Sequence, residues 1–230
     1  MAPLASEVRQ FLEPLLLAVA ALLPIVNPLG GAPIFLAKTS DLTSEERDDV
    51  ARRVAINCFM LLLVSTFIGA YVLDFFALSI PAVQVAGGAV VCAMGWYLLH
   101  EPEQPQTAAR DAARASTPSD LARRAFYPLA MPLTVGPGSM SVAITLGANP
   151  VPDVRSLIAT SIAHTLGILI VTLAVFLCYR YAERILRRLG SVGTVIVSRL
   201  MAFILLCIGV QILWNGVAGL AATLHVGPLR

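Results

Sequence analysis

The chain has 230 residues, of which 57% are hydrophobic and only 13% charged, with a formal net charge of +2. An average soluble domain carries about a quarter charged residues, and a soluble globule of this size leaves roughly a quarter to a third of its unfolded-state surface in water. The composition therefore excludes a water-soluble protein and predicts an integral membrane protein. The small net charge gives no support to nucleic-acid binding.

Six long apolar stretches follow one another along the chain. A helix that crosses a bilayer needs about 20 apolar residues, and each stretch reaches that length. We therefore expect an all-α integral membrane protein with six transmembrane helices, at about 12–37, 54–76, 80–99, 126–148, 156–179 and 197–222.

The basic residues are distributed unequally between the two sides of these spans. With six spans, both termini share a side with the turns near 74–81 and 148–155, and that side carries only Arg9, Arg155 and Arg230. The other thirteen Lys and Arg residues fall on the opposite side. Because Lys and Arg near span ends stay in the cytoplasm, we expect a multi-pass protein of a bacterial inner membrane with both termini periplasmic.

The expected cytoplasmic connections carry helix signals. Thr43 followed by Glu46 predicts a capping box at the start of the second helix. Residues 101–124, rich in proline and alanine, predict a polar cytoplasmic linker, and residues 180–190 predict an amphipathic segment against the inner leaflet.

The cysteines lack the spacing of a metal or redox site. All four fall inside apolar runs, where we expect buried, unoxidised packing residues: Cys58, Cys92, Cys178 and Cys207.

Spans one and four each contain a cluster of helix breakers near the midpoint. Span one has Pro24 and then residues 27–33 (NPLGGAP), and span four has Pro128, Pro132 and then residues 136–139 (GPGS). Proline inside a helix removes a backbone hydrogen bond at a cost of about 3 kcal/mol, and free backbone groups inside a membrane must be buried in protein or line a wet cavity. Isolated packing kinks are the alternative interpretation, but two clusters at matching places favour broken helices 1 and 4.

The two breaks divide the chain into similar halves. Pro28 and Pro137 are 109 residues apart, and each cluster is followed by two uninterrupted spans. Residues 1–100 and 125–230 thus predict two three-helix repeats joined by the linker, and an odd number of spans per half makes the repeats inverted. Paired interrupted spans are the best sequence pointer to a transporter site at the membrane midplane.

The residues at the breaks suit a zwitterionic ligand. No carboxylate lies in mid-span, which disfavours a buried acidic relay. Half-helices that start near Gly30 and Gly138 have amino ends that attract a carboxylate, while Asn27, Thr134 and exposed carbonyl groups suit an ammonium group. The candidate substrate-binding residues are Asn27, Pro28, Gly30, Gly31, Thr134, Gly136, Pro137, Gly138 and Ser139.

Two further polar residues are candidates for a proton or polar relay. His164 is the ionisable group nearest to mid-span in the uninterrupted helices, and imidazole titrates near neutral pH. Its alternative role is a neutral histidine bonded to a carbonyl group of a neighbouring helix. Gln211 in span six is the second candidate.

Three motifs resemble the MarC family of bacterial inner-membrane proteins: residues 23–36 (LPIVNPLGGAPIFL), residues 85–88 (VAGG) and residues 128–139 (PLAMPLTVGPGS). The resemblance covers nearly the whole chain. It implies six spans in two related halves, a place among amino acid and metal exporters, and carriage of glycine, alanine and similar small neutral amino acids. Gly31 departs from the family pattern, which usually has Asn there, so one polar ligand is lost.

We therefore expect a secondary transporter of small neutral amino acids or similar polar solutes that works by alternating access. An exporter of drugs or other metabolites is the alternative within transport, and a non-transporting scaffold or an intramembrane enzyme is the alternative of another class. The enzyme is disfavoured because no nucleophilic, paired-acid or metal-ligand cluster is present. We expect no cofactor, metal or catalytic residue; the coupling ion, sodium or proton, and the oligomeric state stay open.

Overall fold

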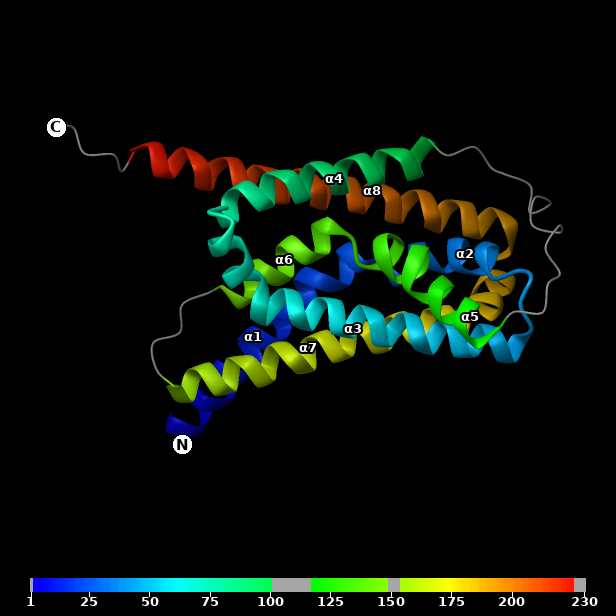
Figure 1. Cartoon of the computed structure of the whole chain (residues 1–230), viewed down its shortest axis with the longest axis horizontal. Helices are drawn as coiled ribbons and strands as arrows, with labels where there is room; N and C mark the ends of the chain where they lie inside the picture. The colour runs from blue at the N-terminus through cyan, green and yellow to red at the C-terminus, as the bar shows by residue number, and fades with distance from the viewer. Residues whose placement is uncertain (1, 101–116, 149–153, 226–230) are drawn as a thin grey trace.

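The computed structural model describes residues 2–100, 117–148 and 154–225, and these ranges are helical apart from short turns. Figure 1 shows the helices lying roughly along one axis, with the start of α1 and the end of α8 at the same end of the molecule. In chain order they are α1 (Ala2–Val26), α2 (Pro28–Lys38), α3 (Ser44–Phe75), α4 (Ile80–His100), α5 (Pro118–Arg124), the π-helix η2 (Ala125–Thr134), α6 (Pro137–Gly147), α7 (Val154–Arg180) and α8 (Ala182–His225).

The expected all-helical membrane architecture is confirmed. Within the described ranges, five helical segments are long and apolar enough to cross a bilayer, and one bent pair of helices makes a sixth. The bent pair is 119–134 with Pro137–Gly147, so span four is broken as predicted. Span one, Arg9–Lys38, passes the same test as one segment, and its interruption is confined to a single residue between α1 and α2.

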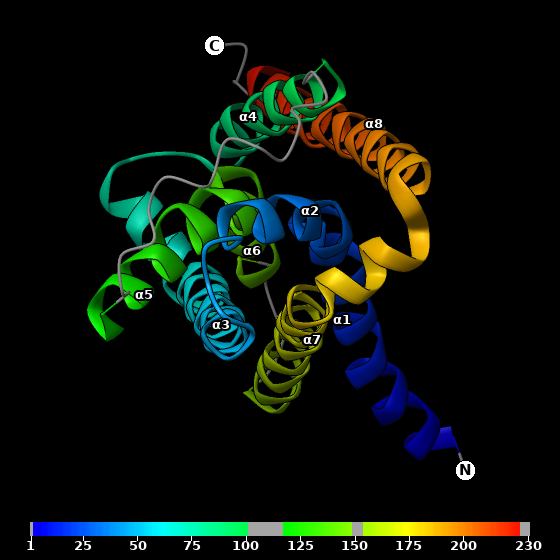
Figure 2. The same cartoon turned by 90° about the vertical axis from the view of Figure 1, so that its right-hand side faces the viewer.

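The helices form two groups (Figure 2). α4 and α8 run antiparallel along one side, and α1, α2, α3, η2, α6 and α7 form the rest of the bundle. The main apolar core lies in the second group, whereas a smaller buried cluster of Ile25, Val91, Leu205 and Ile212 joins the α4/α8 pair to it. The two groups of helices therefore contact each other through this smaller cluster, which is separate from the main core.

Glycines bring the backbones of α4 and α8 into contact. A Cβ atom on Gly88 would lie 2.5 Å from the backbone nitrogen of Leu213, and a Cβ atom on Gly209 would lie 2.6 Å from that of Cys92. Close backbone approach through small residues is the usual way in which membrane helices associate, because lipid supplies no hydrophobic drive between them.

Local features of the connections between the spans are visible in the structure, and the predicted capping box is confirmed. The capping box at Thr43 and Glu46 starts α3, and Gly190, with φ of +68°, separates residues 182–189 from the long remainder of α8. Of the expected polar linker, residues 101–116 lie outside the described residues, and 118–124 form the helix α5, which Thr117 caps and which runs into η2.

The cysteine prediction is correct for oxidation state and wrong for part of the burial. All four cysteines are free thiols. Cys58 is fully buried, Cys92 and Cys178 are half-buried, and Cys207 is exposed on α8. The exposed thiol of Cys207 lies on an apolar membrane-spanning part of α8, where a weakly polar side chain is compatible with a lipid environment.

Basic side chains pair with acids at the end of the bundle opposite to the start of α1. Arg180 of α7 lies 3.2 Å from Asp48 of α3, and Arg47 of α3 lies 3.4 Å from Glu183 of α8. The helix ends that carry these residues are at the right of Figure 1. This end, called the basic end below, comprises the ends of α2 and α7 and the beginnings of α3, α5 and α8.

Candidate functional site

The first break is a one-residue interruption at Asn27. This residue has left-handed backbone angles (φ 47°, ψ 59°), which asparagine tolerates better than most residues. Backbone hydrogen bonds persist on both sides, from the Asn27 N–H to the Leu23 carbonyl and from the Gly31 N–H to the Asn27 carbonyl, each 3.0 Å long. The interruption therefore changes the path of the chain while leaving few backbone groups free.

Asn27 also caps the half-helix that follows it. Its side-chain oxygen accepts a hydrogen bond from the Gly30 N–H at 3.1 Å, and the side chain folds so closely over Gly30 that a Cβ atom there would collide with the amide. Pro28 has no N–H, so Leu29 carries the remaining unpaired N–H of this first turn. The Asn27 amide nitrogen stays free to donate.

The second break is sharper. Val135 and Gly136 are extended, and the helices on either side meet at 72°. Before the break, Tyr127 and Met131 have extended backbone angles inside the wide turns of η2. Both residues precede a proline, and the proline ring disfavours helical angles in the preceding residue. The sequence PLAMPLTVGP thus explains both the irregular first half of span four and its termination.

The amino end of α6 differs from that of α2 because no side chain caps it. The Ser139 hydroxyl donates to the Gly136 carbonyl at 2.9 Å and so turns away from the N–H groups of the first turn. Gly138 is buried, and a Cβ atom on it would collide with Val91 of α4. The seam with α4 thus requires glycine at position 138, and Gly136 and Pro137 carry the more accessible part of this turn.

Tyr179 of α7 joins the two interrupted spans. Its side chain is fully buried, its hydroxyl lies 2.7 Å from the Thr134 hydroxyl, and its ring stacks on Phe35 of α2 at 4.5 Å between centroids. Thr134 in turn donates to the Leu129 carbonyl at 2.7 Å. Because a threonine hydroxyl has one hydrogen, Tyr179 is the donor in the bond to Thr134.

The space for the Tyr179 hydroxyl exists because residue 31 is glycine. A Cβ atom on Gly31 would lie 2.5 Å from the phenolic oxygen. A longer side chain at this position, such as that of asparagine, would not fit beside this tyrosine. Gly31 and Thr134 thus belong to one buried cluster with Phe35 and Tyr179, here called the tyrosine cluster.

The two relay candidates lie away from this cluster. His164 is buried on α7, 15 residues before Tyr179, which corresponds to about 22 Å along a helix. Its role, as a proton carrier or as a neutral histidine bonded to a carbonyl group of a neighbouring helix, stays a prediction. Gln211 is exposed on α8 and donates to Asn215 at 2.9 Å.

The chemistry available at the breaks is neutral. Backbone dipoles, the Asn27 amide and the hydroxyls of Thr134 and Ser139 line this region, and no acidic residue contributes to it among the described residues. The structure also shows no group of three metal-ligating side chains within those ranges. Such an arrangement suits weak binding of a polar or zwitterionic solute.

The sequence missed Tyr179 and Phe35. A tyrosine followed by arginine at the end of an apolar span is typical of an interface anchor, and its partners lie 45 or more residues away in the chain. The only local signal was Gly31, because a glycine in place of a larger residue leaves space that another side chain can occupy.

Comparison with known proteins agrees with the architecture. The profile of the MarC family integral membrane proteins matches residues 12–221. The chain is 32% identical over 220 residues to the inner membrane protein MarC of Salmonella typhimurium and to that of Salmonella paratyphi A, and 32% identical over 217 residues to that of Escherichia coli O1:K1. Each alignment covers 91% of this chain and 96% of the relative. No solved structure matches the chain. The chain therefore belongs to the MarC family and is a multi-pass protein of the bacterial inner membrane.

Proposed function

We propose that this chain is a secondary transporter of small neutral amino acids, such as glycine and alanine, or of similar polar solutes. The observation that carries the proposal is the uncapped amino end of α6 at the 72° break, next to a second interrupted span. A helix amino end attracts anions through its free N–H groups and dipole, with an effect of about 0.3–2 kcal/mol. The Gly136–Ser139 turn therefore receives the substrate carboxylate in this proposal.

Backbone carbonyl groups before each break serve the substrate ammonium group. Pro28 has no N–H, so the carbonyl group of Pro24, four residues earlier, lacks its usual helical donor. The carbonyl group of Leu133 lies in the last turn of η2, where the helix supplies no further donor. The side-chain oxygen of Asn27 adds a second acceptor on the first span, where it already caps Gly30. Several weak partners of this kind are appropriate for a carrier, which has to release what it binds.

We propose that the two halves are inverted repeats. The packing of the helices supports this symmetry, because span one (α1 and α2) packs against α7 just as span four (η2 and α6) packs against α3. The third helices of the halves, α4 and α8, pair with each other in antiparallel directions. In each half the first helix therefore packs on the second helix of the other half.

We also propose that the basic end faces the cytoplasm and that both termini are periplasmic. Thirteen Lys and Arg residues lie on the side of the basic end and three on the side of the termini. This distribution supports the orientation because Lys and Arg near span ends stay in the cytoplasm.

Uptake into proteoliposomes tests the transport proposal. Purified protein in vesicles should take up labelled glycine or alanine, and separate sodium and proton gradients identify the coupling ion. Asn27→Ala should abolish uptake with insertion intact, while Asn215→Ala, which changes an exposed asparagine on α8, should leave uptake unchanged. Absence of flux for every small neutral amino acid under both gradients would reject the substrate class.

His164 is the proposed proton carrier if the proton gradient drives uptake. It is a buried ionisable residue of α7. His164→Gln should then abolish uptake driven by protons while exchange of substrate between equal pools continues. Uptake that still follows the proton gradient in this variant would remove the assignment.

A further inference from the structure

We propose that the tyrosine cluster is a gate, closed in this structure, that separates the two breaks from the basic end of the bundle. The inference rests on the proposed transport function, and it assigns a role to Tyr179, Phe35, Gly31 and Thr134 acting together. The gate is held by the hydrogen bond from Tyr179 to Thr134 and by the stacking of Tyr179 on Phe35.

The position of the cluster along the helices supports this role. Gly31 and Phe35 follow Asn27 by four and eight residues on α2, which is about 6 and 12 Å toward Lys38 and the basic end. Tyr179 directly precedes Arg180, whose guanidinium pairs with Asp48 at that end. Thr134 ends η2 at the second break itself, so the cluster lies on the side of the breaks that faces the basic end.

The contacts of Tyr179 explain why one side chain can close this region. It reaches α2 of the first half through Phe35 and Gly31, and η2 of the second half through Thr134. Tyr179, Phe35 and Thr134 are each at most 2% exposed. A displacement of α7 relative to η2 has to break the hydrogen bond, and a displacement relative to α2 has to break the stack, so opening on either side disrupts a contact of Tyr179.

The hydrogen bond is the part of the gate that a small change can remove. The phenolic hydrogen has Thr134 as its acceptor, and Thr134 has already used its own hydrogen on Leu129. Tyr179→Phe keeps the aromatic ring and its stack while it deletes the hydroxyl. It therefore weakens the closed state with little change in volume.

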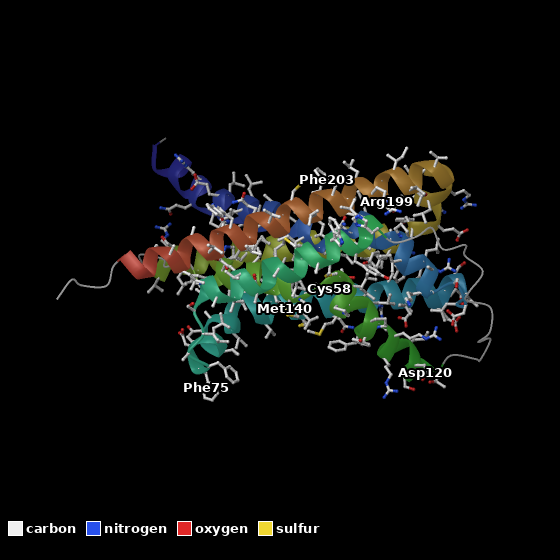
Figure 3. The ribbon with its side chains drawn as sticks, turned by 90° about the horizontal axis from the view of Figure 1, so that it is seen from above. Cys58, Phe75, Asp120, Met140, Arg199 and Phe203 are labelled. Atoms are coloured by element: carbon white, nitrogen blue, oxygen red, sulfur yellow. The ribbon has the colours of Figure 1, made fainter. Side chains whose placement is uncertain are left out.

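A native cysteine reports on the state of the gate. Cys58 of α3, labelled in Figure 3, is fully buried and belongs to the same buried core as Phe35 and Tyr179. Alkylation requires the thiolate, which needs water, so Cys58 reacts only when the cluster opens. Its reaction rate in the native protein is then proportional to the open population.

The experiment compares Cys58 labelling in the full-length protein with the other three cysteines replaced by alanine. A membrane-impermeant maleimide is added to oriented vesicles from the side of the basic end. Tyr179→Phe should accelerate labelling about two- to tenfold, the effect of losing one hydrogen bond. Thr172→Val is the matched control, because it removes another buried hydroxyl of α7 that bonds only to its own helix.

A second variant tests the gate independently, in case Tyr179→Phe does not fold. Gly31→Ala places a methyl group against the phenolic oxygen and should accelerate Cys58 labelling from the same side. Equal rates in the parent and both variants, or equal acceleration in Thr172→Val, would overturn the gate. Labelling needs no substrate, so a parent protein that shows these rates but no amino acid flux would refute the transport proposal alone.

Discussion

The guanidinium of Arg199 on α8 donates a hydrogen bond of 3.2 Å to the carbonyl oxygen of Leu98 in the last turn of α4. The same group also bonds to the carbonyl of Leu99. The last carbonyl groups of a helix lack partners within the helix, and its dipole favours a cation there. Arg199, labelled in Figure 3, thus joins the α4/α8 pair at the end of α4 that faces the basic end.

Arg199→Ala should therefore destabilise the protein. Hydrogen bonds from a charged donor contribute about 1.5–3 kcal/mol, and Arg199→Lys should lose less because it keeps the charge. Thermal unfolding in detergent measures the effect. Arg9→Ala, at an exposed ion pair, is the control and should change the melting temperature little. Identical melting temperatures for Arg199→Ala and the parent would contradict the role of this cap.

Asn27 combines a left-handed backbone with a side-chain cap, and two substitutions separate these contributions. Asn27→Gly keeps access to positive φ and loses the cap, which costs only a few tenths of a kcal/mol because glycine itself is a favourable cap. Asn27→Ala loses the cap and adds the left-handed strain of a Cβ atom, for a total of about 2 kcal/mol. Chemical or thermal unfolding should rank the parent, the glycine variant and the alanine variant in that order. An alanine variant as stable as the glycine variant would show that the strained backbone relaxes.

Gly138 and Val91 compete for the same space at the seam between α6 and α4. Gly138→Ala should destabilise the protein by about 1–3 kcal/mol through overpacking, since the new methyl group meets the Val91 side chain. Val91→Ala in the same chain removes the obstructing methyl groups and should restore part of the stability. A double-mutant cycle measures this coupling. If the losses of stability from Gly138→Ala and Val91→Ala simply add in the double variant, the two side chains do not compete for the same space.

The orientation in the membrane can be tested by labelling from one side. In a chain without native cysteines, Arg52→Cys at the basic end and Arg155→Cys at the other end place single thiols on opposite sides of the bundle. We expect an impermeant thiol reagent added to intact cells to label position 155 and to spare position 52, because the basic loops stay in the cytoplasm. The reverse pattern would invert the proposed orientation.

The sequence predicted those features that depend on neighbouring residues. Six spans followed from apolar length, the α3 capping box from Thr43 and Glu46, and the break in span four from its prolines and glycines. Those signals are local because they act through backbone hydrogen bonding. The prolines and glycines did not predict how sharp each break is: Asn27 caps α2 with its own side chain, whereas α6 has no side-chain cap.

Contacts between distant parts of the chain escaped prediction. In the sequence Tyr179 is typical of a residue at the membrane interface, but in the structure it packs against α2 and η2. Gly138 was predicted to bind substrate, but the Val91 side chain fills the space in which a side chain at position 138 would lie. Gln211 is polar and near mid-span, yet it lies on the outward face of α8. Hydropathy alone does not distinguish inward from outward faces in a chain that is apolar on all sides.

The crossed packing of the two halves has a consequence for biogenesis. Helix α4 has its main partner in α8, and α3 has much of its contact surface on η2, α6 and α7, all of them made later. The newly made amino-terminal half therefore enters the lipid before the surfaces that cover it exist. Assembly has to await the end of synthesis, and a chain truncated after α4 would be left without the partners that protect it from degradation.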